Sequence, residues 1–194
     1  MYNNQLLKLE NSYTLTEYTK TMSVKEFYES YVNFNETLKS CKYCDTYNKN
    51  WSCPPFDKDM TYIWNSYENM DLYLLELHYN ENIQENIYKQ EDIDVILNLT
   101  LFNEKRKLLN RLYDEVKEKE GMILSTGYCN ICSKCSKITH NPCRYPKNKL
   151  HSIESVGGLV TKASKELFGT EILWINMEKV KIPEHLSLLM ALLY

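Results

Sequence analysis

Seven cysteines carry the clearest chemistry in this sequence, and four of them lie within fifteen residues. Cys129, Cys132 and Cys135 form a C-x2-C-x2-C pattern, and Cys143 follows after seven more residues. A loop with a cysteine at every third position can curl around an iron–sulfur cubane and supply three thiolates, while the fourth arrives from elsewhere. Zinc sites more often use two separated C-x2-C knuckles. This second cysteine group therefore favours an iron–sulfur cluster, with a zinc ion or metal-free structural or redox-active thiols as alternatives.

The first cysteine group contains Cys41, Cys44 and Cys53 in the pattern C-x2-C-x8-C, followed by two prolines. Three thiols are one short of a closed tetrahedral or cubane site. A more distant ligand can complete such a site, and the candidates are Asp45, a histidine or a cysteine of the second group. Alternatively, one iron stays open and binds a substrate as a Lewis acid. Both alternatives remain open at the level of the sequence.

The assignment of cysteines to the two sites is also ambiguous. In two-cluster ferredoxins the cysteine that precedes a proline binds the other cluster, and Cys53 is the one cysteine here that is followed by proline. Under that rule Cys53 would complete the second group, and Cys143 would join the first. Local closure, in which Cys143 completes the second group, is simpler, and we prefer it.

The second group lies in a basic segment. Residues 121–153 contain no Asp or Glu, and the rest of the chain carries a net charge of −8. The five cations of the segment are Lys134, Lys137, Arg144, Lys147 and Lys149. Cations stabilise an anionic cubane, and a basic surface attracts acidic partners. We expect residues 134–149 to be either a solvated loop or a docking site for an acidic redox partner. A nucleic acid is a weaker candidate, and His140 is an alternative zinc ligand ranked below the cysteines.

Composition predicts a single metal-binding domain over residues 1–194. The chain has a net charge of −3 and is 43% hydrophobic, enough for a substantial core. We expect an N-terminal extension over about residues 1–37 and cysteine loops at 41–56 and 127–146. Neither a signal peptide nor a bilayer-spanning apolar run is recognisable, so the sequence predicts a cytoplasmic protein without membrane contact. Seven thiols in a reducing compartment are expected to bind metal rather than to form disulfides.

Hydrophobic periodicity predicts strands that alternate with helices. The expected strands cover 13–19, 71–79, 121–126, 171–177 and 185–194, and the last of these segments could equally be a helix. One expected helix begins at Ser23. Three others cover 57–67, 92–120 and 159–169. This order predicts an α/β or α+β fold with a single mixed sheet, packed helices and two cysteine-rich metal-binding loops next to strands.

Several short motifs in combination resemble a known family. They are C-x2-C, "WSCPPF", "GYCNICSKC", "PCRYP" and "SIESVGG". The sequence from Cys41 onward resembles the cysteine-rich family of predicted metal-binding proteins, domain of unknown function 2284. This resemblance implies metal binding through all seven cysteines and no particular reaction. The similarity to bacterial ferredoxins covers Cys129 to Cys135 alone.

The leading hypothesis from the sequence is an iron–sulfur protein with one or two [4Fe-4S] clusters. It would act in electron transfer or as a redox accessory to another enzyme. The first alternative is an enzyme whose three-cysteine cluster binds substrate at an open iron. The second alternative is a zinc-stabilised interaction module. The sequence contains no phosphate-binding P-loop, dinucleotide fingerprint, HExxH motif or nucleophile elbow.

Overall fold

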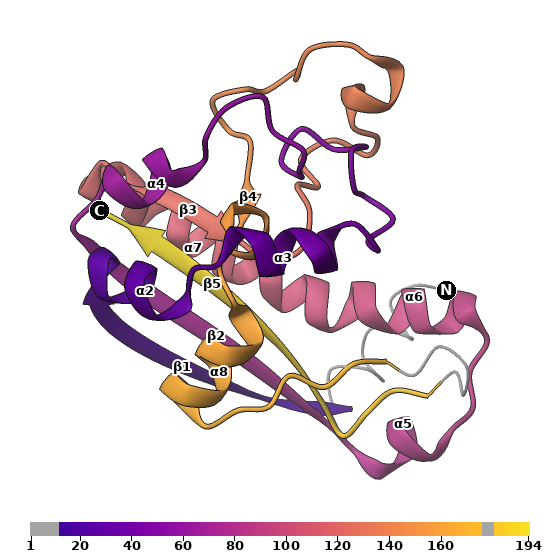
Figure 1. Cartoon of the computed structure of the whole chain (residues 1–194). Coiled ribbons are helices and arrows are strands. Elements are labelled where there is room, and N and C mark those ends of the chain that lie inside the picture. Colours follow the sequence, from indigo (N-terminus) through magenta and orange to yellow (C-terminus); the bar gives the residue numbers. More distant parts are fainter. Residues whose placement is uncertain (1–11, 176–180) are drawn as a thin grey trace.

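The computed structural model describes residues 12–175 and 181–194 (Figure 1). Within these residues the centre is a five-stranded sheet with the order β1-β2-β5-β3-β4. The strands are β1 (Tyr13–Ser23), β2 (Asn69–Tyr79), β3 (Met122–Ser125), β4 (His151–Ser152) and β5 (His185–Leu193). Neighbouring strands are antiparallel except β3 and β4, which are parallel. The predicted single mixed sheet with packed helices is therefore confirmed.

Strands β2 and β5 are buried on both faces, which explains their nearly continuous apolar sequences. Successive side chains of β2 point to opposite faces of the sheet. Leu74 packs in one core with Phe27, whereas its neighbour Leu75 packs in a second core with Leu112. The sheet is therefore the middle of three layers.

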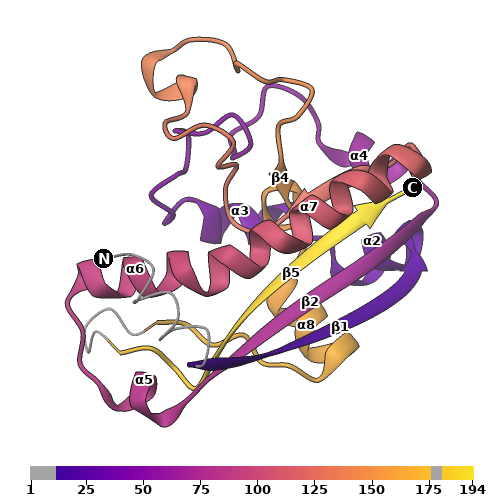
Figure 2. The ribbon, with the colours of Figure 1, turned by 180° about the vertical axis from the view of Figure 1, so that it is seen from behind.

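Helices cover both faces of the sheet (Figures 1 and 2). The first core is covered by α2 (Val24–Tyr31), α4 (Thr61–Asn65) and α8 (Val160–Phe168). The second core is covered by α7 (Leu101–Lys119), and α6 (Gln90–Leu99) packs in a third, smaller core. Helix α3 (Phe34–Cys41) packs against the short 3-10 helix η2 (Glu154–Val156), which directly follows β4. The short helix α5 (Glu81–Glu85) follows β2.

The ends of the helices follow local rules. Ser23 caps α2, because its hydroxyl accepts a hydrogen bond from the backbone N–H of Glu26 at 3.1 Å. Gly169 ends α8 with φ = 75°, a conformation that glycine adopts without strain. Gly121 follows α7, and a Cβ atom there would lie 2.2 Å from the carbonyl oxygen of Leu193. Glycine is therefore required where β3 begins beside β5.

Two of the predicted helices are shorter than expected. The segment 57–67 is helical over Thr61–Asn65 alone. Its N-cap is Met60, and the Asp59 side chain just before it accepts a hydrogen bond from the backbone N–H of Thr61. The segment 92–120 is divided at Thr100 into α6 and α7. The Thr100 hydroxyl bonds the carbonyl of Ile96 and the hydroxyl of Tyr79, and this contact with β2 fixes the break.

The strand predicted over 171–177 was wrong for its described part. Residues 171–175 form no strand, and residues 176 and 177 lie outside the described residues. Strand β5 already pairs with β2 on one edge and with β3 on the other, so a hairpin partner has no place beside it. The predicted strand over 185–194 is confirmed as β5.

The expected N-terminal extension, 1–37, contains β1, α2 and the beginning of α3, and its first eleven residues lie outside the described residues. Among the described helices, even the 19-residue α7 lacks the continuous apolar length that a bilayer crossing requires.

Candidate metal centres

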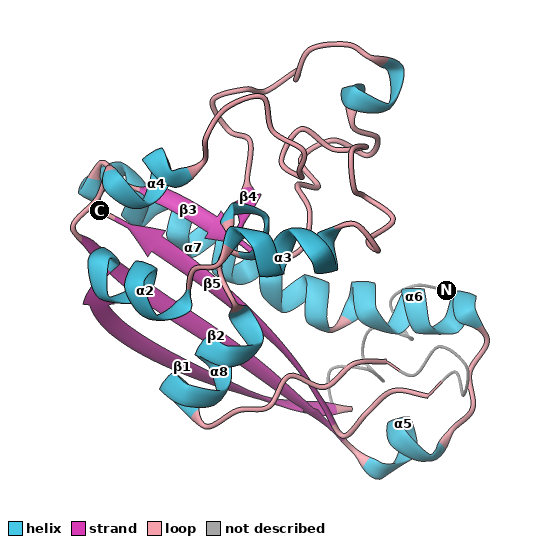
Figure 3. Ribbon diagram, viewed as in Figure 1, coloured by secondary structure: helices cyan, strands magenta, loops and turns pink. Residues whose placement is uncertain are grey.

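The two cysteine segments meet beyond one end of the sheet. The chain between α3 and α4 lies beside the chain between β3 and β4 in both views of the ribbon (Figures 1 and 2), and both segments consist mainly of loops (Figure 3). Side chains of the first segment bond the backbone of the second. Asn50 Nδ2 donates to the carbonyl of Cys129, and Trp51 Nε1 donates to the carbonyl of Asn141, both at 2.9 Å. The two groups therefore belong to one lobe.

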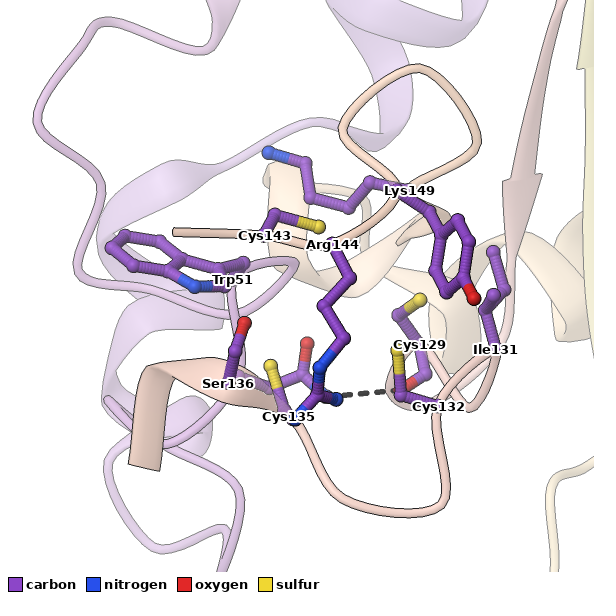
Figure 4. A pocket seen from close by; sticks show the side chains of 11 residues that line it. Trp51, Cys129, Ile131, Cys132, Cys135, Ser136, Cys143, Arg144 and Lys149 are labelled. Carbon is purple, nitrogen blue, oxygen red and sulfur yellow. Dashed lines mark hydrogen bonds between the residues drawn. The ribbon is translucent and has the colours of Figure 1, made fainter. Parts of the chain in front are cut away.

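The second cysteine group surrounds one small cavity of about 20 Å³. The cavity is lined by all four members: Cys129, Cys132, Cys135 and Cys143. Figure 4 shows their side chains around that of Arg144, which also lines the cavity. Arg144 Nη1 donates to the carbonyl of Lys134 at 2.8 Å, so the guanidinium spans the loop. A bound group larger than a single ion must displace this side chain.

A tight turn brings the last cysteine of the group back toward the others. The 3-10 helix η1 (Ser136–Thr139) follows Cys135, and the Ser136 hydroxyl donates to the carbonyl of Pro142 at 2.7 Å. His140 ends this turn in the left-handed region, with φ = 54°. His140 is exposed and does not line the cavity. The turn thus places Cys143 beside the same cavity as Cys129, Cys132 and Cys135, and local closure of this group stays a prediction.

The first cysteine group combines three different environments. Cys41 is the last residue of α3 rather than the start of a loop, and it is half-buried; Cys44 is exposed and Cys53 is buried. The Thr46 hydroxyl lies 3.1 Å from the sulfur of Cys44 and 3.6 Å from the sulfur of Cys53. One hydroxyl therefore links two of the three thiols.

Burial keeps two thiols of this group, those of Cys41 and Cys53, protonated in the absence of metal. Burial, followed by the negative charge of Glu154 and of the neighbouring thiols, raises the pKa of Cys41 to about 11. Burial also raises the pKa of Cys53, although hydrogen bonds from the hydroxyls of Thr46 and Ser52 oppose this shift. A metal ion must displace these protons, because the thiolate is the ligand.

The sulfur atoms line a cavity rather than meeting at one point. Within residues 12–175 and 181–194, no three His, Cys, Asp or Glu side chains come close enough together to hold a single ion. The donor set of the second group, four thiols in a loop with five cations and no carboxylate, nevertheless suits an anionic iron–sulfur cluster.

The family of the chain follows from a comparison with family models. A model described as a predicted metal-binding protein (DUF2284) matches residues 28–193. The chain belongs to this family. The match includes both cysteine groups, and the family resemblance expected from the motifs is confirmed. No curated protein and no solved structure matches the chain.

In this member of the family, a buried network joins the two cysteine groups, and the sequence did not reveal it. The Ser52 hydroxyl donates to Asn50 Oδ1 at 2.9 Å and accepts from the backbone N–H of Cys129 at 3.1 Å. The same oxygen lies 3.9 Å from the sulfur of Cys53. Ser52 is fully buried, and so the backbone of one group is tied to a thiol of the other through a single side chain.

His151 is a second residue that the sequence analysis missed. It is 3% exposed, and its Nδ1 donates to the carbonyl of Ser52 at 3.2 Å. Its ring contacts the Phe56 ring edge-on. Burial lowers the pKa of His151 to about 4, although the bond to Ser52 opposes the shift. His151 is therefore neutral near pH 7 and orients the segment that carries Cys53.

A buried lysine and a partly buried glutamate next to the lobe influence each other's pKa. Lys105 on α7 is 4% exposed, and its Nζ donates to the carbonyl of Thr126 at 2.7 Å. Burial lowers its pKa, while the negative charges of Glu154 and Cys129 oppose that shift. Burial raises the pKa of Glu154, and Lys105 is among the groups that oppose this. Glu154 lies within the "SIESVGG" motif, but the motif did not single it out.

Proposed function

We propose that the second cysteine group holds a [4Fe-4S] cluster and that the protein acts in electron transfer or as a redox accessory in the cytoplasm. The observation that carries this proposal is the cavity lined by all four thiols within a segment of five cations and no acid. Four thiolates and nearby cations are the ligands and the charge environment that such a cluster needs.

The position of the sulfurs supports a cluster over a zinc ion. A structural zinc ion requires four ligands about 2.0 to 2.3 Å from one point. The sulfurs of the second group instead line the wall of a cavity that Arg144 also lines. A polyatomic cluster binds thiolates at separate corners and would take the place of the Arg144 side chain. A zinc-stabilised interaction module is the alternative that the metal analysis below decides.

The first cysteine group is a candidate for a second cluster. The network through Ser52 holds the two groups next to each other, with Cys53 and Cys129 in contact with the same hydroxyl. Two redox centres in this arrangement would exchange electrons over a short distance. An enzyme with an open metal position is the second candidate function, and the observation that favours it is a cleft beside Cys41.

The basic lobe is the proposed docking surface for an acidic redox partner. Lys134, Arg144 and Lys147 are exposed there. Tyr128 and Tyr145 are 51% and 52% exposed beside them. Cations steer an acidic partner, and exposed aromatic side chains supply the apolar contact of an interface. This surface surrounds the second cysteine group, so a docked partner would lie close to its cluster.

The direct test is metal analysis of protein purified without oxygen. We expect a brown protein with iron and acid-labile sulfide in equal amounts and with an EPR signal after reduction. Cys132→Ser is expected to remove the cluster of the second group, whereas Ser133→Ala in the same loop keeps it. A colourless protein with stoichiometric zinc and no sulfide would exclude the iron–sulfur proposal.

A further inference from the structure

Glu154 lies where three cavities adjoin, outside the four-cysteine cavity. Two of them, about 450 and 340 Å³ in volume, share Thr37, Cys41 and Glu154 in their walls. A third, of about 410 Å³, shares Glu154 and Trp174 with the larger of the first two. These volumes fall in the range of small-molecule sites. The first two cavities form one cleft beside the first cysteine group.

The floor of the cleft carries a buried oxygen without a partner. Among the described residues, Glu154 Oε2 is buried and accepts no hydrogen bond. Its position is rigid: Ser152 and Ser155 exchange hydrogen bonds between hydroxyls and backbone N–H groups, and the N–H of Gly158 donates to the carbonyl of Ile153 at 2.8 Å. A buried polar atom without a partner is costly, and a donor group on a ligand would satisfy it.

The first turn of α8 forms the opposite wall. Leu159 is its N-cap and offers no side-chain acceptor, and the first turn contains no acidic residue. Thr161 and Lys162 of this turn line the cleft. The positive end of the helix dipole favours an anion there. Of the backbone N–H groups in this turn, that of Val160 donates to the carbonyl of Gly158 at 3.1 Å. Glycine is required at position 158 for packing between η2 and α8, because a Cβ atom there would lie 2.3 Å from the Ile153 side chain.

The second part of the cleft has an apolar wall, and Lys58 and Asp59 also line this cavity. Phe34 and Leu38 of α3 face the loop that carries Phe56 and Met60 across this cavity. The cleft thus combines an anion position at α8, an acceptor at Glu154 and an apolar wall, with Cys41 beside all three.

We propose that this cleft binds a small organic acid that carries a hydroxyl or amine next to its carboxylate and an apolar side chain. The carboxylate lies at the first turn of α8, the hydroxyl or amine donates to Glu154, and the apolar part packs on the Phe34 wall. This binding site is independent of the electron-transfer proposal and does not require that the metal be iron. It places a substrate beside the three-cysteine group, which has one ligand fewer than a closed site.

Four related probes test the proposal by calorimetry on the full chain as purified: phenyllactate, phenylalanine, phenylpropionate and phenethylamine. Phenylpropionate lacks the donor, and phenethylamine lacks the carboxylate. We expect phenyllactate or phenylalanine to bind at least about tenfold more tightly than phenylpropionate or phenethylamine. The reason is that each charged hydrogen bond contributes to the binding free energy. No binding of any probe at about 10 mM, or equal affinity of all four, would overturn the proposal.

Two variants assign the contacts. Glu154→Gln should weaken phenyllactate about tenfold and leave phenylpropionate unchanged, whereas Glu166→Gln, an exposed control on α8, changes neither. Thr161→Asp should abolish binding of the acids and spare phenethylamine. A new acid in the first turn stabilises the helix, so misfolding does not explain that result. If Glu154→Gln and Glu166→Gln changed the affinity for phenyllactate equally, Glu154 would not be part of the binding site. If Glu154→Gln fails to fold, the probe ratios in the parent protein and the Thr161→Asp variant decide.

Discussion

The two cysteine groups use the same ligand atoms in opposite surroundings. The second group lies in a loop, is surrounded by cations and encloses a cavity of about 20 Å³. The first group begins at the end of α3, lies near Glu154 and borders a cleft more than ten times larger. A closed site with four thiols suits a permanent cofactor, whereas three thiols beside a cleft suit a site that a substrate can reach. We therefore propose that the two groups have different roles.

The sharpest test of this comparison is removal of one ligand from each group. Cys132→Ser should abolish the cluster of the second group, while Cys41→Ser should remove metal from the first group alone. Each variant is expected to lose all metal at its own site, because the remaining thiolates cannot close it. Iron and sulfide content and EPR spectra measure the outcome. Loss of all metal in both variants would show that the seven cysteines form a single site.

Acid should destabilise the interface between the groups through His151. Because the native pKa is about 4 and the unfolded value about 6.5, the unfolded chain binds the proton first. Stability is therefore complete above pH 6.5 and falls by up to about 3 kcal/mol as the pH decreases to 4. His151→Asn retains a donor for Ser52 and should remove this part of the decline. Urea unfolding at each pH measures it.

Exposed His140 provides the control for that experiment. His140→Asn makes the same replacement at an exposed side chain outside the interface, and it shows how much of any change comes from the substitution itself. If His151→Asn also follows the parent curve between pH 6.5 and 4, the neutral buried imidazole does not contribute to stability.

The buried Ser52 hydroxyl should have the next largest effect. Ser52→Ala leaves the backbone N–H of Cys129 and the amide oxygen of Asn50 without this partner, at a cost of about 1–3 kcal/mol in unfolding free energy. If both groups hold clusters, their magnetic interaction in the reduced EPR spectrum should also weaken. Ser66→Ala, in which the lost bond is local and exposed, should cost less than about 0.5 kcal/mol. Equal costs for the two variants would argue against the network.

The fold was largely predictable because its signals are local. The alternation in β1, the apolar runs of β2 and β5 and the cap at Ser23 are properties of short segments. The break at Thr100 depends on the Tyr79 hydroxyl, 21 residues away in the chain. The missing strand over 171–175 depends on both edges of β5 being occupied. Such contacts depend on the tertiary structure, and the hydrophobic periodicity of the sequence does not predict them.

The site divides in the same way. Cysteines are predictable because their residue type alone indicates metal chemistry. Ser52, His151 and Glu154 are common residue types whose roles arise from burial and from partners 77 to 99 positions away for the first two. For Glu154 a signal did exist: it is the first acid after the long segment without acids, and two glycines follow shortly. The spacing of the cysteines predicts metal ligands in both groups, but it does not show that one of the groups borders a cleft.

The smallest expected effect concerns the charge of Arg144. Two substitutions distinguish the influence of this charge on the reduction potential from the influence of side-chain packing. Arg144→Gln should lower the reduction potential of the second group's cluster, because a cation favours the more negative reduced state. For a charge a few ångströms away in partly aqueous surroundings we expect about 1 kcal/mol, or about 40 mV for one electron. Arg144→Lys keeps the charge and should restore most of the potential. A cluster in the first group, which Arg144 does not line, should shift less, and equal shifts at both sites would contradict the separate environments inferred for the two groups.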